Sequence, residues 1–198
     1  LSEVVARETD TLVSLKEKVR LATILGTFQS TLTDFKYLRK IWKNNTEEER
    51  LLGVSLTGIM DCATLHKGKE VADTLEVLRV TAIDANKAMA WELGIEQSAA
   101  VTCVKPSGTV SQLTDAASGI HARHNPYYIR TVRGDNKDPL TQFLISQGIP
   151  AEPDVMKPDS TTVFSFPMKS PKGAITRTQM NAIEQLELWL TYQRHWCE

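Results

Sequence analysis

Cysteine and long apolar stretches are scarce in this 198-residue sequence, and each scarcity excludes a class of protein. The three cysteines, Cys62, Cys103 and Cys197, form no Cys-x-x-Cys pair and no Cys/His metal spacing, which argues against a disulfide scaffold and against a zinc site. No apolar run approaches the roughly 18 residues that a membrane-spanning helix needs. We therefore expect no metal and no membrane partner.

An excess of basic charge is also missing. The chain has 23 basic and 24 acidic residues and a formal net charge of -1, so it lacks the positive charge that sequence-independent nucleic-acid binding requires. Its first residues have neither the basic start nor the apolar core of a signal peptide. We expect no direct nucleic-acid partner and a cytoplasmic location.

What is present is typical of a globular protein, with 41% hydrophobic and 24% charged residues. Leu1–Val5 has the pattern of the middle of a strand, and Gln185–Glu198 that of a helix without a glycine or proline terminator. Both ends are therefore predicted to be cut, and the chain to be a fragment.

The first half of the sequence predicts two helices and a strand. Thr9 and Asp10 are candidate caps for an amphipathic helix that runs to about Phe28. Thr46 and Glu49 have the spacing of a capping box, which predicts the start of a short helix. A buried strand bounded by glycines is predicted within residues 51–60.

A long helix is predicted next, over Val71–Leu93, with Gly94 where a left-handed cap would end it. The apolar, β-branched segment Ala99–Val104 predicts a buried strand, and Lys105–Ser111 a tight turn that opens a new element.

Strands are predicted to alternate with helices over most of the sequence, including its second half, which favours parallel βα units over a sandwich or a bundle. The expected elements are a strand at Tyr127–Arg133, a helix at Leu140–Gln147, a strand at Thr161–Pro167 and a last helix capped by Thr176 and Gln179.

The turn Lys105–Ser111 is the strongest candidate for a binding site. A phosphate needs converging backbone N–H groups, hydroxyl donors and a nearby positive charge, and a glycine lets the backbone come close. This segment offers all of them, although it has no Walker A spacing. An ordinary turn of this composition accounts for the pattern equally well.

The other titratable residues have ordinary structural explanations. His121, Arg123 and His124 could face an anionic substrate, but a solvated connector is the commoner origin of such a loop. Arg130 and Arg133 could line an anion site, but most such arginines are surface charges.

The cysteines and the aromatic residues near the C-terminus also favour structural roles. Cys62 and Cys103 are predicted to be buried small hydrophobes, since neither has an evident base beside it in the sequence. Trp189, Tyr192 and Trp196 are predicted to pack in the core.

Five segments, taken in order, resemble the C-terminal half of the catalytic domain of adenosylcobalamin-dependent (class II) ribonucleotide reductase, and most closely its monomeric ribonucleoside-triphosphate branch. The resemblance covers essentially the whole chain. The segments are Leu52–Asp61, Val104–Ser111, Ser118–His121, Tyr127–Arg130 and Gln185–Leu190.

The resemblance implies an α/β fold that is part of the family's ten-stranded α/β barrel, with residues 1–198 as its C-terminal half, truncated at both ends. It also implies that the turn is the loop that holds the substrate phosphates. The implied phosphate-binding residues are Ser107, Gly108, Thr109, Val110 and Ser111.

The resemblance further implies adenosylcobalamin as cofactor, a ribonucleotide as substrate, a thioredoxin-type reductant as partner and a monomeric full-length protein. One departure matters: the family's radical cysteine lies in an Asn-x-Cys-x-Glu motif, which is absent here, and the C-terminal shuttle cysteines are missing as well. We therefore assign no catalytic residue to this chain and expect it to be inactive alone.

Two alternatives fit the same motifs. One is a metal-dependent or glycyl-radical reductase with the same barrel, and the other is a non-catalytic nucleotide-binding or assembly module derived from that barrel. The motifs also leave open whether the substrate is a triphosphate or a diphosphate.

Overall fold

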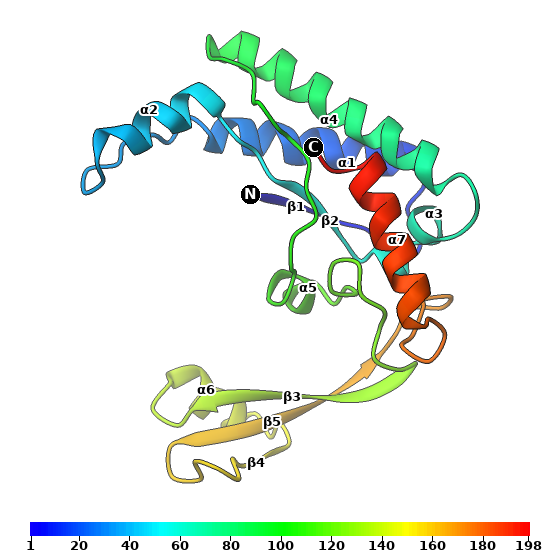
Figure 1. The fold of residues 1–198 in the computed structure, drawn as a ribbon. Coiled ribbons are helices and arrows are strands. Elements are labelled where there is room, and N and C mark those ends of the chain that lie inside the picture. The colour runs from blue at the N-terminus through cyan, green and yellow to red at the C-terminus, as the bar shows by residue number, and fades with distance from the viewer. The chain divides into compact units, whose positions relative to one another are not determined.

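The computed structural model describes all 198 residues, and the chain divides into two compact units (Figure 1). The first unit consists of Leu1–Arg123 and Pro171–Glu198, and the second consists of His124–Ser170. Each unit has its own sheet.

The sheet of the first unit is a parallel pair, β1 (Ser2–Val5) and β2 (Val54–Thr57), in which Glu3 lies opposite Ser55 and Val4 opposite Leu56. Because side chains alternate along a strand, the Val4 row and the Glu3 row point to opposite faces. Val4 and Leu56 belong to the hydrophobic core, so the Glu3 row lies on the face away from it.

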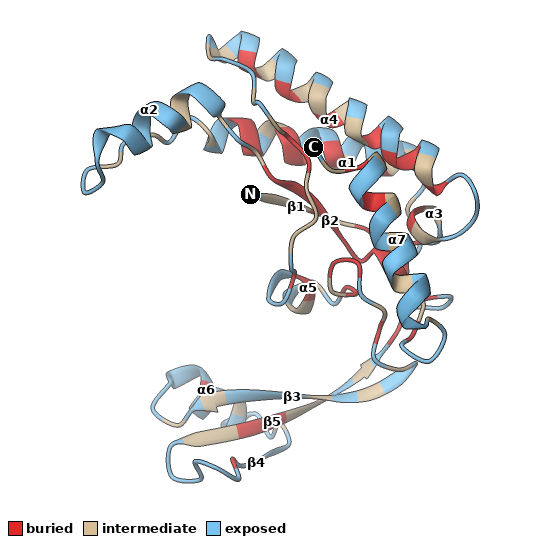
Figure 2. Ribbon diagram, viewed as in Figure 1, coloured by how far each residue is buried: buried red, intermediate tan, exposed pale blue.

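Three helices build the core against this sheet. Helix α1 (Leu12–Gln29) packs on both strands, α4 (Val71–Leu93) packs on α1, and α7 (Ala182–His195) packs on α4. Figure 2 shows the buried residues gathered on β2 and on α1 and α4. The largest fully buried side chains of this core include Leu15, Leu75, Leu78, Tyr192 and Trp196.

The long helix α4 confirms its sequence pattern: it begins at Val71, ends at Leu93, and Gly94 adopts the left-handed conformation that ends it. The first helix is also confirmed, but its cap is Thr11, whose side chain accepts a hydrogen bond from the Ser14 N–H.

Two predicted capping boxes were misplaced. Helix α2 (Lys40–Glu49) already contains Thr46 and Glu49, because a spacing of three also joins neighbours within a helix. Gln179 does accept hydrogen bonds from Thr176. Helix α7 nevertheless begins later, at a capping box formed by Asn181 and Glu184.

The segment Ala99–Val104 is not a regular strand, contrary to prediction. It runs along the free edge of β2, and Val54 exchanges backbone hydrogen bonds with Val101 and Cys103. Its outer edge meets a side chain instead of a strand, since the Glu198 carboxylate accepts from the N–H groups of Val101 and Thr102 at 2.8 and 3.2 Å.

Three short helical turns complete the first unit. They are η1 (Ile59–Asp61), α3 (Ala63–His66) and α5 (Val110–Leu113).

The second unit is an antiparallel sheet in the order β3–β5–β4, formed by β3 (Tyr127–Asp135), β4 (Ala151–Pro153) and β5 (Thr161–Lys169). The expectation of parallel βα units is therefore wrong here. A parallel crossover is a connection of a dozen or more residues, and it usually contains a helix that carries the chain back along the strand. Helix α6 (Pro139–Ser146), at about 12 Å, is much shorter than the roughly 30 Å of β3.

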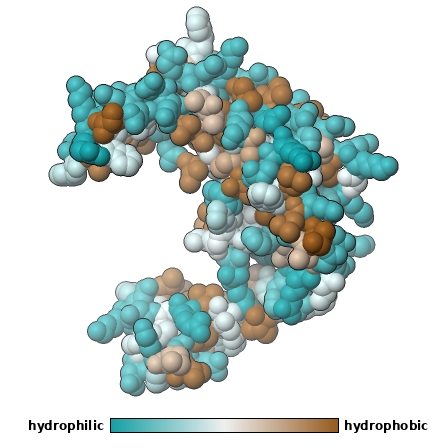
Figure 3. All heavy atoms as spheres, in the orientation of Figure 1, coloured by the Kyte–Doolittle hydropathy of each residue, from teal (hydrophilic) through white to brown (hydrophobic).

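The two sheets make the chain a mixed α/β structure, and by itself the chain forms no barrel. None of its helices combines the length and the apolar character needed to cross a membrane. Figure 3 shows hydrophobic residues scattered among hydrophilic ones on the face it draws.

Candidate functional site

The predicted phosphate loop lies in the first unit, between the segment beside β2 and the short helix α5. Its middle is exposed: Gly108, Thr109 and Val110 all face solvent. Its two serines are buried, with Ser107 4% and Ser111 0% exposed. The loop therefore presents backbone and one threonine outward and turns its serines inward.

The two serine hydroxyls are used inside the chain. Ser107 Oγ donates to the carboxylate of Glu3, and Ser111 Oγ donates to the carbonyl oxygen of Ser107. Ser118 Oγ donates to that same carbonyl. Ser107 is thus the point at which strand β1, the loop and the following segment meet.

Lys105, the positive charge expected beside the loop, also has a partner within the chain. Lys105 Nζ forms an ion pair with Glu3, whose side chain is only 7% exposed. Lys105 is therefore the positive charge that the sequence predicted near the loop, and it already has a carboxylate partner within the chain.

What remains free is a set of donors on the exposed part of the loop. The N–H groups of Gly108, Thr109 and Val110 have no acceptor within the chain, and the Thr109 hydroxyl makes no hydrogen bond. A β-carbon at Gly108 would have no atom within 4 Å. Successive N–H groups in a turn can form a concave site for an anion.

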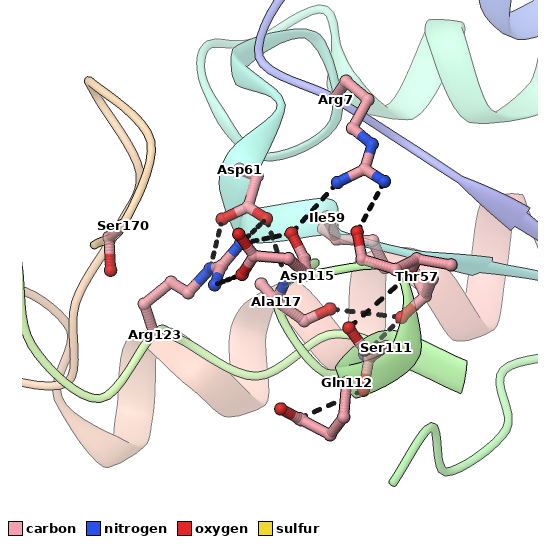
Figure 4. Close-up of polar contacts among 12 residues, drawn as sticks. Arg7, Thr57, Ile59, Asp61, Ser111, Gln112, Asp115, Ala117, Arg123 and Ser170 are labelled. Carbon is pink, nitrogen blue, oxygen red and sulfur yellow. Dashed lines mark hydrogen bonds and ion pairs between the residues drawn. The ribbon is translucent and has the colours of Figure 1, made fainter. Parts of the chain in front are cut away.

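A buried ion-pair cluster fixes the segment that follows the loop (Figure 4). Arg123 binds Asp61 through two hydrogen bonds of 2.9 and 2.8 Å and pairs with Asp115 at 2.9 Å. Asp61 also accepts from the N–H of Ala117 at 2.7 Å. Arg7 extends the cluster by donating to the carbonyl of Asp115 at 3.0 Å.

Thr57, the last residue of β2, also holds this segment through hydrogen bonds. Thr57 Oγ1 donates to the carbonyl of Ala117 at 3.1 Å and accepts from the N–H of Gly119 at 2.8 Å. Gly58 follows with φ of 75°, and a β-carbon there would lie 2.3 Å from the carbonyl oxygen of Ala6. Only glycine fits this turn.

A cavity of about 410 Å³ adjoins the loop, a volume typical of small-molecule sites. Lys105 and Pro106 form one side of it, and Leu186 and Trp189 of α7 form another. Trp189 is 45% exposed, so the prediction that it packs in the core is wrong, whereas Tyr192 and Trp196 are fully buried as predicted.

The other candidate residues do not converge on the loop. Arg123 is 4% exposed, and so it is neither part of a solvated connector nor available to a substrate. His121 is exposed at the rim of the cavity. In the second unit, His124 stacks edge-on against Tyr128, and Arg133 pairs with Asp154 at 2.7 Å.

The buried position predicted for Cys62 is confirmed, whereas Cys103 is only half-buried. Cys62 is fully buried in the core, and burial raises the pKa of its thiol. Burial also raises the pKa of Cys103 and of Cys197, which are half-buried.

Glu3 and Asp61, two acidic residues that hold the loop and the segment after it, were not predicted from the sequence. The available signal was position: Glu3 is a charge inside a β-branched strand, and Asp61 directly follows the apolar residues Ile59 and Met60. Buried carboxylates of this kind require partners, but the sequence did not show which cations would supply them.

The chain was compared with known proteins. No family model matches it. It is 30% identical, over 92% of its length, to the adenosylcobalamin-dependent ribonucleoside-triphosphate reductase of Euglena gracilis, and 29% identical, over 79%, to the protein of that name from Lactobacillus gasseri. It covers 28% and 24% of those proteins.

The fold matches a crystal structure of a B-12-dependent (class II) ribonucleotide reductase, with a TM-score of 0.77. The match covers 92% of this chain and 29% of that one, at 24% identity, and it therefore bears on the fold alone. Together with the named relatives, it confirms the resemblance that five sequence motifs predicted.

Proposed function

We propose that this chain is a segment of an adenosylcobalamin-dependent ribonucleotide reductase and that it supplies the loop that holds the substrate phosphates. In the proposed reaction the 2'-hydroxyl of a ribonucleotide is replaced by hydrogen and leaves as water. A thioredoxin-type dithiol, the proposed partner, is oxidised to a disulfide. The named relatives support a ribonucleoside triphosphate as the substrate.

The observation that carries the proposal is the set of unpaired donors on the loop. Gly108, Thr109 and Val110 present N–H groups without acceptors, beside a free threonine hydroxyl. A phosphate carries several acceptor oxygens and negative charge, so it suits such a set. Ser107 and Ser111 would shape the loop, since their hydroxyls already have partners within the chain.

The cofactor would be held mainly by parts of the enzyme other than this chain. Adenosylcobalamin is larger than the drug-sized ligands that fill cavities of about 300–1,000 Å³. Cavities in the first unit have volumes of about 410, 460, 490 and 600 Å³ and do not enclose it. We assign no cobalamin contact to these residues.

The reacting groups would likewise lie elsewhere. The chain has no Asn-x-Cys-x-Glu motif, and burial raises the pKa of each of its three cysteines, which disfavours the reactive thiolate form. We therefore propose that the 198 residues form the C-terminal half of the catalytic barrel and are inactive alone.

The test is a reductase assay on the full-length protein. Ribonucleoside triphosphates and a dithiol reductant are supplied with and without adenosylcobalamin, and deoxyribonucleotides are quantified. The proposal predicts product only with the cofactor, and none from the isolated 198-residue chain. Product formation without adenosylcobalamin would favour another radical class of reductase. Nucleotide binding without any reduction would favour a non-catalytic binding module.

A further inference from the structure

One carboxylate joins strand β1 to the phosphate loop. The two oxygens of Glu3 have separate partners: Oε1 accepts from Ser107 Oγ, and Oε2 pairs with Lys105 Nζ. More than 100 residues separate Glu3 from the loop in sequence. Both partners belong to that single loop.

The sheet explains how this contact arises. Glu3 lies opposite Ser55 in the register of β1 and β2, on the face of the sheet away from the hydrophobic core. The segment that leads into the loop runs along the other edge of β2. The Glu3 side chain therefore reaches the loop across that face.

Burial makes the two sides depend on each other. The side chains of Glu3 and Lys105 are 7% and 20% exposed, so neither charge is well solvated without the other. The carbonyl of Ser107 in turn accepts from the hydroxyls of Ser111 and Ser118. Loss of Glu3 would release Ser107, which is the residue that holds the turn together.

We propose that Glu3 is a positioning residue for the phosphate loop, an inference that rests on the phosphate-binding function proposed above. It acts through Ser107 and Lys105, which it holds so that the free N–H groups of the loop converge. It does not bind the phosphate itself, because a carboxylate repels an anion.

Two physical effects oppose each other when Glu3 is removed. A negative charge disappears from the neighbourhood of an anionic ligand, which favours binding. The loop loses its anchor, which disfavours binding because the donors must then be ordered by the ligand. Positioning as the main role of Glu3 requires the second effect to dominate.

The experiment measures nucleoside-triphosphate affinity and thermal unfolding of the full-length protein. Glu3→Ala should weaken affinity about 10-fold, the loss expected for one charge-assisted hydrogen bond. Glu3→Gln keeps an acceptor for Ser107 and should lose only about 3-fold. The matched control is Glu8→Ala, an exposed glutamate without an ion pair, which should leave affinity unchanged.

A double-mutant cycle separates positioning from a general loss of stability. In a protein that already carries Ser107→Ala and Lys105→Met, Glu3→Ala should change nucleotide affinity less than about 2-fold, because its two partners are gone. An equal loss in both backgrounds would overturn the inference. If Glu3→Ala fails to fold, Glu3→Gln is used in the same cycle.

Two further outcomes would also overturn the inference. One is tighter nucleotide binding by Glu3→Ala, which would make the carboxylate a repulsive charge. The other is a lower unfolding temperature with unchanged affinity, which would make Glu3 purely structural. Thr109→Ala separates a failure of this inference from a failure of the proposed phosphate-binding function. If Thr109→Ala weakens nucleotide binding and the Glu3 variants do not, only the positioning role of Glu3 is wrong. If Thr109→Ala also has no effect, the phosphate-binding function of the loop is wrong.

Discussion

Arg123 and Asp61 form a bidentate ion pair in which both side chains are almost completely buried, at 3% and 1% exposure. Arg123 also pairs with Asp115, whose side chain is 57% exposed. The pair fixes the segment after the proposed phosphate loop against the turn that follows β2. Two acidic partners at different depths allow a matched comparison.

Asp61→Asn should therefore destabilise the protein by about 3 kcal/mol, because it leaves a buried guanidinium without its main counter-charge. Asp115→Asn, at the exposed end of the same cluster, should cost about 1 kcal/mol or less. Chemical denaturation of both variants measures the difference. Equal costs would show that the buried pair contributes no more than a surface contact.

The Thr109 hydroxyl is the free side-chain donor on the loop, and this distinguishes it from Ser107 and Ser111. Thr109→Ala in the full-length protein should weaken substrate binding by roughly 10-fold to 100-fold, the equivalent of one hydrogen bond to a charged group. Thr31→Ala, an exposed threonine distant in sequence from the loop, is the control and should have no effect on affinity. Calorimetric titration with a nucleoside triphosphate measures both. Unchanged affinity for Thr109→Ala would exclude the hydroxyl as a ligand.

Asp10 should contribute to acid sensitivity. Burial raises the pKa of its carboxyl, but hydrogen bonds from Lys18, Ser14 and the N–H of Arg7, together with the Lys18 charge, outweigh burial and hold the pKa below its ordinary value of 3.8. A carboxyl whose pKa is lower in the folded state stabilises the fold above the unfolded value, and that contribution is lost as the pH falls through the folded value.

Asp10→Asn should therefore lower stability at neutral pH and reduce its dependence on pH below about 4. Thermal unfolding between pH 2 and pH 7 checks both effects. A pH dependence identical to that of the unaltered protein would contradict the assignment.

Cys62 should resist alkylation in the folded protein. Its side chain is completely buried and burial raises the pKa of the thiol, so little thiolate exists at pH 8 and little of it is accessible. Iodoacetamide labelling followed by peptide mass spectrometry should modify Cys62 more slowly than the half-buried Cys103 and Cys197, and at a similar rate only after denaturation. Rapid labelling of Cys62 in the native protein would contradict this.

Local signals predicted the helices better than the sheets. The apolar spacing and Gly94 located α4 correctly because both act within a few residues. The direction of β5 against β3 depends on where the intervening chain packs, which alternation of strand and helix does not specify. Helix α6 has only eight residues, and the connection after it forms β4, which pairs with β5 in an antiparallel sheet.

The position of the candidate loop could be predicted from the sequence, but the partners of its side chains could not. Composition pointed to the Ser107–Ser111 turn, yet it gave no indication that Ser107 and Lys105 are both committed to Glu3. Arg123 was misjudged for the same reason, since its burial depends on Asp61, which is 62 residues away in sequence. Long-range pairs of buried charges leave no periodic pattern in a sequence.

Gly108→Val is the sharpest test of whether this loop holds substrate phosphates. A β-carbon at Gly108 meets no atom of the chain within 4 Å and the residue does not have a positive φ, so the substitution should leave the fold intact. Any loss then reports on an approaching ligand. The measurement is nucleoside-triphosphate affinity of the full-length variant, with adenosylcobalamin affinity and the unfolding temperature as internal controls. We expect a larger loss of nucleotide affinity than for Thr109→Ala, with both controls unchanged. Unchanged nucleotide affinity in a well-folded Gly108→Val protein would contradict the account and make the loop an ordinary turn.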